Sequence, residues 1–236
     1  RIAHEIKNPL TPIQLSADRL KRKFANLPPE DRAALDQYAD VISRQAADIR
    51  RMVDEFSKFA RMPDPERRDE DLEAIVKGAA LLQQEAGQGV AFTVRTDGPA
   101  PLRCDRGLIG QALTNLLKNA AEAVQARMAE RPEPPGEVRV ALIREPGALT
   151  VEIADNGCGL PETGRERLTE PYVTTRARGT GLGLAIVKKI AEQHGGTLTL
   201  EDAPSFADGA APGALARLRL PLTPADTERP RAQRRA

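Results

Sequence analysis

The sequence has few cysteines, no long apolar run and almost no net charge. Among its 236 residues only Cys104 and Cys158 carry thiols, too few for a disulfide framework, so we expect both to stay reduced in the cytoplasm. No apolar run approaches the roughly 20 residues that span a bilayer, and no basic-then-apolar leader opens the chain. Lys and Arg total 35 against 34 Asp and Glu, and a net charge of +1 gives no basis for binding nucleic acid. We therefore expect neither nucleic acid nor a membrane to contact this chain.

An initiator methionine is also absent, because the sequence opens on Arg1 with a helical pattern already in place. We therefore expect a fragment of a longer protein, with sensing domains or membrane segments upstream.

Apolar residues spaced alternately by three and four predict two helices in the first 60 residues. A break at residues 26–31, which contains two prolines, predicts that the helices form a hairpin. The predicted seam residues are Ile6, Leu10, Ile13, Ala17, Leu20 and Phe24, then Leu35, Tyr38, Ile42, Ile49, Met52, Phe56 and Phe59. A single hairpin leaves apolar surface uncovered, so we expect a homodimer in which two hairpins form a four-helix bundle.

The rest of the chain has a mixed pattern, which predicts an α+β sandwich of helices against one sheet. We expect a hairpin domain over 1–61, a Pro-rich linker over 62–68, a second domain over 69–222 and a disordered tail over 223–236. The expected helices are 72–84, 106–128 and 182–194, and the expected strands are 90–95, 137–144, 149–154, 197–201 and 214–220.

The first motif with chemical content is His4-Glu5-Ile6-Lys7-Asn8-Pro9. On a helix His4 would lie about 200° from Ile6 and face solvent, where a neutral imidazole offers a lone pair able to attack phosphorus. Glu5 would hold the other ring N–H, and Asn8 would share the face of His4. The alternative is that Pro9 starts the helix and His4 is an ordinary surface residue.

Two further motifs are ambiguous by themselves. Asn115 and Asn119 project from one face of the long predicted helix, and an amide oxygen is a suitable ligand for Mg²⁺, although a pair of core amides is an equal alternative. Asp155 begins a glycine-rich turn after a predicted strand, where a carboxylate can accept from an exocyclic amine. The same turn is also a common hairpin signal.

The last motif is Gly179-Thr180-Gly181-Leu182-Gly183, which precedes an amphipathic helix. Backbone N–H groups at such a helix start predict a phosphate-binding turn. Residues 160–178 predict a mobile lid that supplies cations to phosphates, with an ordinary solvated loop as the alternative. We expect His194, at the end of that helix, to be a cap neighbour rather than a catalyst.

In their order, these motifs resemble the phosphoacceptor, N, G1 and G2 boxes of two-component sensor histidine kinases over residues 1 to 221. The runs at 10–17 and 169–175 look most like the nitrogen-regulation kinases of the NtrY type. The resemblance implies a Bergerat ATP-binding fold, ATP and Mg²⁺ as cofactors, and a response regulator receiver domain as partner. It also implies a full-length protein anchored in the inner membrane, with this part in the cytosol.

By the same resemblance His4 is the phosphoacceptor, aided by Glu5 and Asn8, Asn119 is the Mg²⁺ ligand, and Asp155 accepts from the adenine amine. The implied nucleotide contacts are Asn115, Lys118, Asn119, Asp155, Gly157, Gly159, Thr174, Thr175, Arg176, Gly179, Thr180, Gly181, Leu182 and Gly183. The sequence departs from the family pattern at Glu122, where a basic residue is common, and at Leu168 and Tyr172, where Phe is common.

Two other classes of protein share this nucleotide fold. ATP-driven clamps place a water-activating Glu four residues before the metal-binding Asn, but here that position is Asn115, which cannot take a proton. A non-catalytic dimeric scaffold would have lost the nucleotide motifs, which are intact. The sequence therefore favours a kinase, with regulator phosphatase activity through Asn8 as a second expectation.

Overall fold

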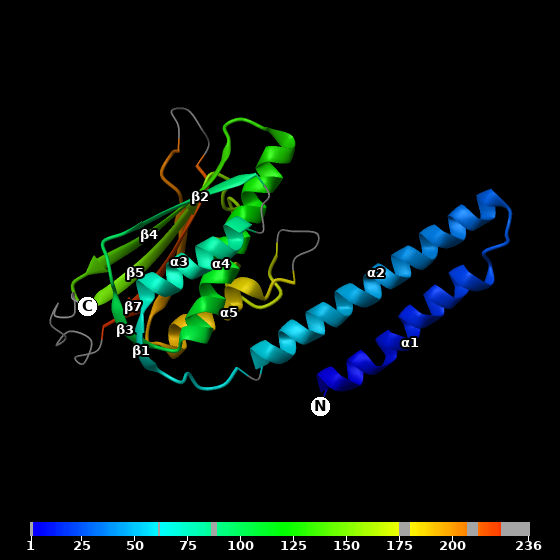
Figure 1. Cartoon of the computed structure of the whole chain (residues 1–236), viewed down its shortest axis with the longest axis horizontal. Helices are drawn as coiled ribbons and strands as arrows, with labels where there is room; N and C mark the ends of the chain where they lie inside the picture. The colour runs from blue at the N-terminus through cyan, green and yellow to red at the C-terminus, as the bar shows by residue number, and fades with distance from the viewer. Residues whose placement is uncertain (1, 61, 86–88, 175–179, 207–211, 223–236) are drawn as a thin grey trace, which may run out of the picture. The chain divides into compact units, whose positions relative to one another are not determined.

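The chain folds into two compact units, Arg1–Pro63 and Asp64–Ala236. The computed structural model describes residues 2–60, 62–85, 89–174, 180–206 and 212–222, and at residues 2–8, 51 and 58 it describes the backbone alone. Figure 1 shows the helices of the first unit and the helices and strands of the second. Within these described ranges, no helix is long and apolar enough to cross a membrane.

The first unit is a helical hairpin of α1 (Ile2–Lys23) and α2 (Pro29–Ala60). Helix α1 runs through Pro9 and Pro12, so the backbone of His4 is helical and the alternative start at Pro9 is wrong. The predicted break at 26–31 is placed too late, because α2 already begins at Pro29. Proline is tolerated at a first helical position, where its missing N–H would have no intrahelical acceptor.

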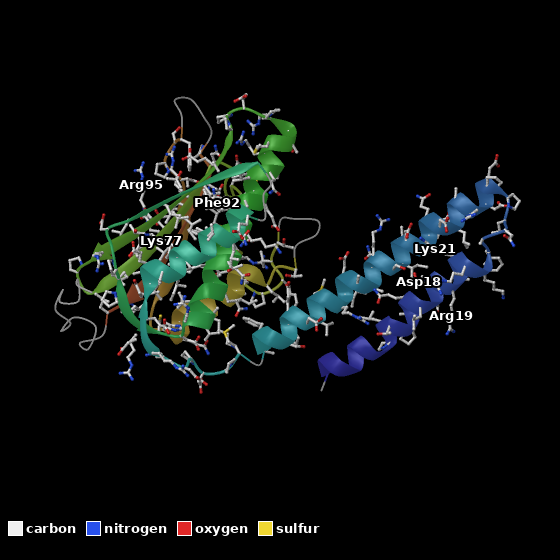
Figure 2. All side chains as sticks on the ribbon, in the orientation of Figure 1. Asp18, Arg19, Lys21, Lys77, Phe92 and Arg95 are labelled. Atoms are coloured by element: carbon white, nitrogen blue, oxygen red, sulfur yellow. The ribbon has the colours of Figure 1, made fainter. Side chains whose placement is uncertain are left out.

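Small side chains bring the two helices together. Leu10 and Ala17 of α1 and Ala39 and Ala46 of α2 are buried within the single hairpin. Near the loop that joins the helices, Lys21 of α1, which Figure 2 labels, donates to Asp40 of α2 over 2.6 Å. Most of the predicted seam stays exposed in the single hairpin: the residues are Ile13, Leu20, Phe24, Tyr38, Ile42, Ile49, Met52 and Phe56. The predicted seam therefore combines two helix faces, and the larger side chains lie on the face that the hairpin does not cover.

The second unit is a five-stranded sheet with helices on one face (Figure 1). The strand order is β2 (Val90–Thr96), β4 (Gly136–Glu145), β5 (Ala148–Asp155), β7 (Ala214–Pro221) and β6 (Thr197–Asp202). Strands β2 and β4 pair in parallel, and the other neighbours are antiparallel. The covering helices are α3 (Leu72–Glu85), α4 (Arg106–Glu130) and α5 (Gly183–Gln193), and α4 contacts both of the others.

Alternation along the strands explains why one face is covered. In β4, the buried residues Val138, Val140 and Leu142 alternate with more exposed ones, so one side of the strand faces the helices. Val124 of α4 and Ile190 of α5 are fully buried opposite this apolar layer. The α+β prediction is confirmed, and each predicted helix and strand of the second unit is present.

Two short strands were not predicted. β1 (Arg68–Asp71) pairs antiparallel with β3 (Pro101–Cys104), separately from the main sheet. The expected linker therefore ends in a strand. A short 3₁₀ helix, η1 (Arg165–Arg167), follows Gly164 within the predicted lid.

The first residues of the second unit are bound next to the start of α4. Asp105 is the N-cap of this helix, and its carboxylate accepts from the N–H groups of Leu108 and Glu66, each over 3.0 Å. Burial opposes the ionised form, but these N–H groups together with that of Gly107 hold the pKa of Asp105 below its usual value. The same carboxylate therefore caps α4 and fixes the incoming backbone.

His194 completes this junction as the C-cap of α5, where a cap neighbour was predicted. Its Nε2 accepts from the backbone N–H of Asp105 over 3.1 Å, and its Nδ1 lies 2.8 Å from the carbonyl oxygen of Ile190. This pattern requires a neutral ring protonated at Nδ1, and burial lowers the pKa of His194. Nearby, Arg67 donates to the carbonyl oxygen of Gln193 over 2.6 Å. We call Glu66, Arg67, Asp105 and His194 the entry clasp.

Candidate functional site

One face of α4 contacts both glycine turns. A Cβ atom added at Gly183 would lie 3.8 Å from Nδ2 and 4.0 Å from Oδ1 of Asn119, so this amide sits at the start of α5. Ala123 follows Asn119 by one turn of α4. A Cβ atom added at Gly157 would lie 2.6 Å from the carbonyl carbon of Ala123, so only glycine fits at position 157. Residues four apart share a helix face. We call Asn115, Asn119, Ala123 and Arg127 the α4 stripe.

Asp155 ends β5 and is only 4% exposed. Its Oδ1 accepts from the N–H of Gly157 over 2.8 Å and from the N–H of Ala214 over 3.4 Å. Gly213 permits this close approach of β7, because a side chain there would overlap the carbonyl oxygen of Asp155. The carboxylate is thus held by backbone N–H groups from the turn after β5 and from the start of β7.

The second glycine turn is joined to the end of the predicted lid. Gly181 has a φ of +68°, and a Cβ there would lie 2.5 Å from the carbonyl carbon of Tyr172. The N–H of Tyr172, itself left-handed at a φ of 67°, donates to the carbonyl oxygen of Gly181 over 2.9 Å. Both residues are therefore constrained by one tight contact.

Within the described residues, no side chain caps the start of α5. Its N-cap is Leu182, which is fully buried and provides no side-chain cap. Thr180 accepts weakly from the N–H of Leu182, over 3.4 Å. The first N–H groups of a helix have no intrahelical acceptor and carry the positive end of the dipole, so this turn suits an anion.

Asn115 adds a donor without an acceptor. Its Nδ2 is buried and makes no hydrogen bond within the described part of the chain. In the same ranges, no group of three or more His, Cys, Asp or Glu side chains forms a metal cluster. The predicted cation ligand is the amide oxygen of Asn119, and an amide oxygen suits a hard ion that keeps its other positions for water or phosphate.

Other predicted site residues are placed as follows. Lys118 is exposed and pairs with Glu122 over 3.9 Å, Thr174 is exposed, and Gly159 packs against the carbonyl oxygen of Pro212. Arg165 attaches the first part of the predicted lid to β6 through a 2.9 Å ion pair with Asp202. Thr175, Arg176 and Gly179, the side chains of His4, Glu5 and Asn8, and the predicted tail at 223–236 lie outside the described residues.

Sequence reasoning missed Gly213, Ala214 and Arg127. Arg127 is only 6% exposed and donates through Nε to the carbonyl oxygen of Asn156 over 3.0 Å. A signal for it existed, because Arg127 follows Asn119 by eight residues and so lies on the same face of the predicted helix. No comparable signal marked Gly213 or Ala214, whose role depends on strand pairing.

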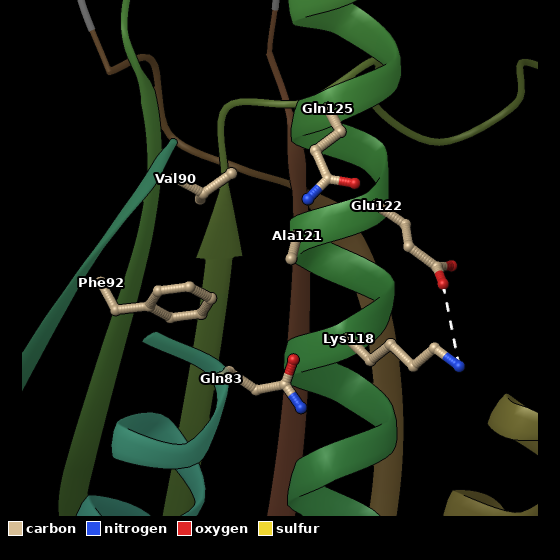
Figure 3. A pocket seen from close by; sticks show the side chains of 7 residues that line it. All are labelled: Gln83, Val90, Phe92, Lys118, Ala121, Glu122 and Gln125. Atoms are coloured by element: carbon tan, nitrogen blue, oxygen red, sulfur yellow. Dashed lines mark ion pairs between the residues drawn. The ribbon is translucent and has the colours of Figure 1, made fainter. Parts of the chain in front are cut away.

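A cavity of about 260 Å³ lies on a different side of α4, between that helix, α3 and β2 (Figure 3). Phe92 points from β2 toward α4 across it. The residues that line the cavity are Gln83, Val90, Phe92, Lys118, Ala121, Glu122 and Gln125. It shares only Lys118 with the predicted nucleotide residues and contains neither glycine turn, so we place the candidate site along the α4 stripe instead.

Comparison with known families assigns a domain to each of the two units. Residues 1–65 match the His Kinase A (phospho-acceptor) domain, and residues 104–224 match the family described as histidine kinase-, DNA gyrase B- and HSP90-like ATPase.

Individual relatives are sensor kinases. The chain is 54% identical over 209 residues to the nitrogen regulation protein NtrY of Azorhizobium caulinodans, which covers 86% of this chain and 26% of that protein. It is 29% identical over 227 residues to the signal transduction histidine-protein kinase AtoS of Escherichia coli, covering 94% of this chain and 34% of that protein. The chain thus spans about a quarter to a third of the length of these curated relatives.

Solved structures of the same kind are similar in fold. The mycobacterial sensor histidine kinase MprB is 29% identical with a TM-score of 0.56, over 66% of this chain and 97% of that one. The histidine kinase ThkA, solved in complex with the response regulator protein TrrA, is 24% identical with a TM-score of 0.64, over 97% of this chain and 61% of that one. The chain therefore belongs to the sensor histidine kinases, with a phospho-acceptor domain followed by the ATPase domain of a protein histidine kinase similar to NtrY.

Proposed function

We propose that this chain transfers the γ-phosphoryl group of ATP to His4 and then to an aspartate on a response regulator. The observation that carries the proposal is the α4 stripe, which contacts the turn after Asp155 at one end and the start of α5 at the other. This arrangement provides a carboxylate for a base and N–H donors for phosphates at the two ends of one face of α4.

Each part of the nucleotide has a partner. Asp155 accepts from the adenine amine, and the uncapped first turn of α5, next to Gly183, binds the phosphates. Asn119 would hold Mg²⁺, which when bound neutralises charge on the phosphates. The buried Nδ2 of Asn115 donates to a phosphate oxygen or its water, which gives this orphan group an acceptor.

Transfer to a side chain is favoured over hydrolysis. Asn115 occupies the position at which related ATPases carry a water-activating carboxylate, and an amide cannot accept a proton from water. In the proposed reaction a ring nitrogen of His4 attacks the γ-phosphorus, the bond from phosphorus to the β–γ bridging oxygen breaks, and ADP leaves. Glu5 orients the imidazole and stabilises the positive charge that it gains.

Incubation with γ-labelled ATP and Mg²⁺ tests the proposal. The label is expected to be lost in acid and kept in base, as a phosphoimidazole requires, and to be absent from His4→Gln. Since His4 lies in the first unit, His4→Gln should bind ATP with unchanged affinity, which serves as the control for folding. Undiminished label in a His4→Gln variant that binds ATP would falsify the assignment.

We also propose a homodimer, in which the uncovered apolar face of the hairpin packs against a second copy. That face includes Ile13, Ile42 and Ile49, each more than two-fifths exposed in one chain. A second hairpin would bury these side chains in a four-helix bundle.

The last part of the proposal is that Asn8 supports removal of phosphate from the regulator. Asn8 follows His4 by one helical turn of α1, so a docked aspartyl phosphate would approach both. Its amide both donates and accepts, and can therefore orient a water without acting as a base.

Asn8→Ala separates the two activities. If Asn8 orients water, regulator dephosphorylation should fall at least about tenfold, whereas labelling of His4 stays within a few-fold. An equal fall in both activities would mean that Asn8 only shapes the helix before Pro9.

A further inference from the structure

Within the described residues, Arg127 is a buried cation whose hydrogen bonds go to carbonyl and amide oxygens and not to a carboxylate. It lies on α4 and is 6% exposed. Its Nη1 donates to the carbonyl oxygen of Arg131 over 3.0 Å, its Nε to that of Asn156 over 3.0 Å, and its Nη2 to the side-chain Oδ1 of Asn156 over 3.4 Å. A buried charge is costly unless it is well hydrogen-bonded, so its presence here calls for a function.

Asn156, the main acceptor, is itself fixed to the sheet. Its Oδ1 also accepts from the N–H of Glu137 over 2.9 Å, and its Nδ2 donates to the carbonyl oxygen of Pro135 over 2.8 Å. Its backbone N–H donates to the carbonyl oxygen of Glu137 over 3.2 Å. Arg127 therefore contacts a residue that has little freedom to move relative to β4.

The peptide bond from Asn156 to Gly157 links Arg127 to Asp155. The carbonyl oxygen of Asn156 and the N–H of Gly157 are the two ends of one planar peptide group. The oxygen accepts from Arg127, and the N–H donates to Oδ1 of Asp155 over 2.8 Å. A cation at one end and an anion at the other polarise this peptide, so both hydrogen bonds are strengthened and the plane is held.

We propose that Arg127 is a positioning residue for base recognition: it holds the Asn156–Gly157 peptide so that this peptide orients the carboxylate of Asp155. The inference rests on the proposed function, in which Asp155 accepts from the adenine amine. Loss of Arg127 then removes preference for the amine, because a carboxylate free to rotate accepts less well from one fixed donor.

The test compares ATP with inosine triphosphate, whose base has a carbonyl oxygen in place of the amine. Binding of both nucleotides is measured by calorimetry for the wild type, Arg127→Gln and Arg127→Lys. The control is Arg131→Gln, which removes an exposed charge four residues further on. All four proteins are also compared in their unfolding midpoints.

Arg127→Gln is expected to weaken ATP binding at least about tenfold and to change inosine triphosphate binding much less, so that the preference for ATP collapses. Arg127→Lys should recover part of the preference, since an ammonium can still donate to the carbonyl oxygen of Asn156. Arg131→Gln should leave both affinities unchanged. An equal loss for both nucleotides in Arg127→Gln would overturn the proposal and reduce Arg127 to a structural role.

Asp155→Asn distinguishes the failure of this inference from that of the proposed function. If Asp155→Asn keeps the wild-type preference for ATP, the adenine role of Asp155 fails. If Asp155→Asn loses the preference and Arg127→Gln keeps it, only the positioning role fails. If Arg127→Gln does not fold, the double variant Arg127→Lys with Asp155→Asn provides the test. If the two residues are coupled, the double variant loses less of the preference for ATP than the sum of the two single losses. Additive losses would contradict the proposal.

Discussion

The buried amide of Asn115 connects stability with binding at a single residue. Its Nδ2 has no acceptor within the described part of the chain. An unpaired buried donor costs about 1–3 kcal/mol, whereas an apolar group of similar shape carries no such cost. The free energy of unfolding and the affinity for nucleotide should therefore change in opposite directions when this amide is replaced.

Asn115→Leu is expected to leave the free energy of unfolding unchanged or to raise it by about 1 kcal/mol, while it weakens Mg-ATP binding about tenfold or more. Urea unfolding and calorimetry measure the two effects. The control is Thr114→Val, because the hydroxyl of Thr114 already donates to the carbonyl oxygen of Gly110 over 2.8 Å and does not require a ligand. A variant at 115 that loses stability and keeps its affinity would contradict this interpretation.

Asp155→Asn should weaken ATP binding roughly 10- to 100-fold, because a hydrogen bond to a charged group contributes about 1.5–3 kcal/mol. An amide at this position also offers a donor toward the adenine amine, which is itself a donor. Calorimetry on the wild type and the variant measures the change, and an unaltered affinity would refute the adenine role.

The positions of Asn119 on a helix face and of Asp155 after a strand were predictable from residue type and local spacing, whereas their roles toward a nucleotide were implied by the family resemblance. A carboxylate after a strand and an amide on a helix face are visible in the sequence. The support from Arg127 and Gly213 was not predicted, since it depends on a helix meeting a turn some 30 residues later and on the pairing of β5 with β7. Helix periodicity places Arg127 on the face of Asn119, but local sequence does not show which turn that face meets or which strands pair.

For the helices and strands, strong hydrophobic periodicity predicted bounds that are nearly correct, whereas short polar strands have no such periodicity and were not predicted. Helix 106–128 was predicted, and α4 spans Arg106–Glu130. Strand β1 reads Arg-Asp-Glu-Asp, which has no apolar alternation, and it exists because its backbone pairs with β3. The parallel pairing of β2 with β4 was equally hidden, because register between distant strands is set by packing.

The entry clasp makes the stability of the second unit depend on pH. Folded His194 has a pKa below 6.5, because it is buried and lies near Arg67, although Asp105 opposes the shift. In the unfolded chain it protonates near 6.5, so its contribution is fully present above that pH and is lost as pH falls from there through the folded pKa. His194→Gln should remove this part of the pH dependence.

Urea midpoints at several pH values between about 7.5 and 5 test this expectation. The chain has no tryptophan and only two tyrosines, so in a Tyr38→Phe background the fluorescence of Tyr172 reports on the second unit alone. Equal slopes for the wild type and His194→Gln would exclude a role for this histidine.

For the whole molecule, the exposed apolar face of the hairpin predicts that association and folding of the first unit are linked. Ile13→Asp with Ile49→Asp should leave unpaired charges in the interface and convert the dimer into monomers in light scattering. Arg19→Asp with Arg44→Asp, which place carboxylates about 200° from the seam residues Ala17 and Ile42, should remain dimeric. A wild-type chain that stays monomeric at high micromolar concentration would refute the dimer.

The hydrogen bond from Tyr172 to Gly181 joins the two ends of the segment between them. Since the ends are already closed, doubling the length of that segment adds only about 0.6 kcal/mol of loop entropy. We therefore expect insertions or deletions in this segment to change the free energy of unfolding of the second unit little.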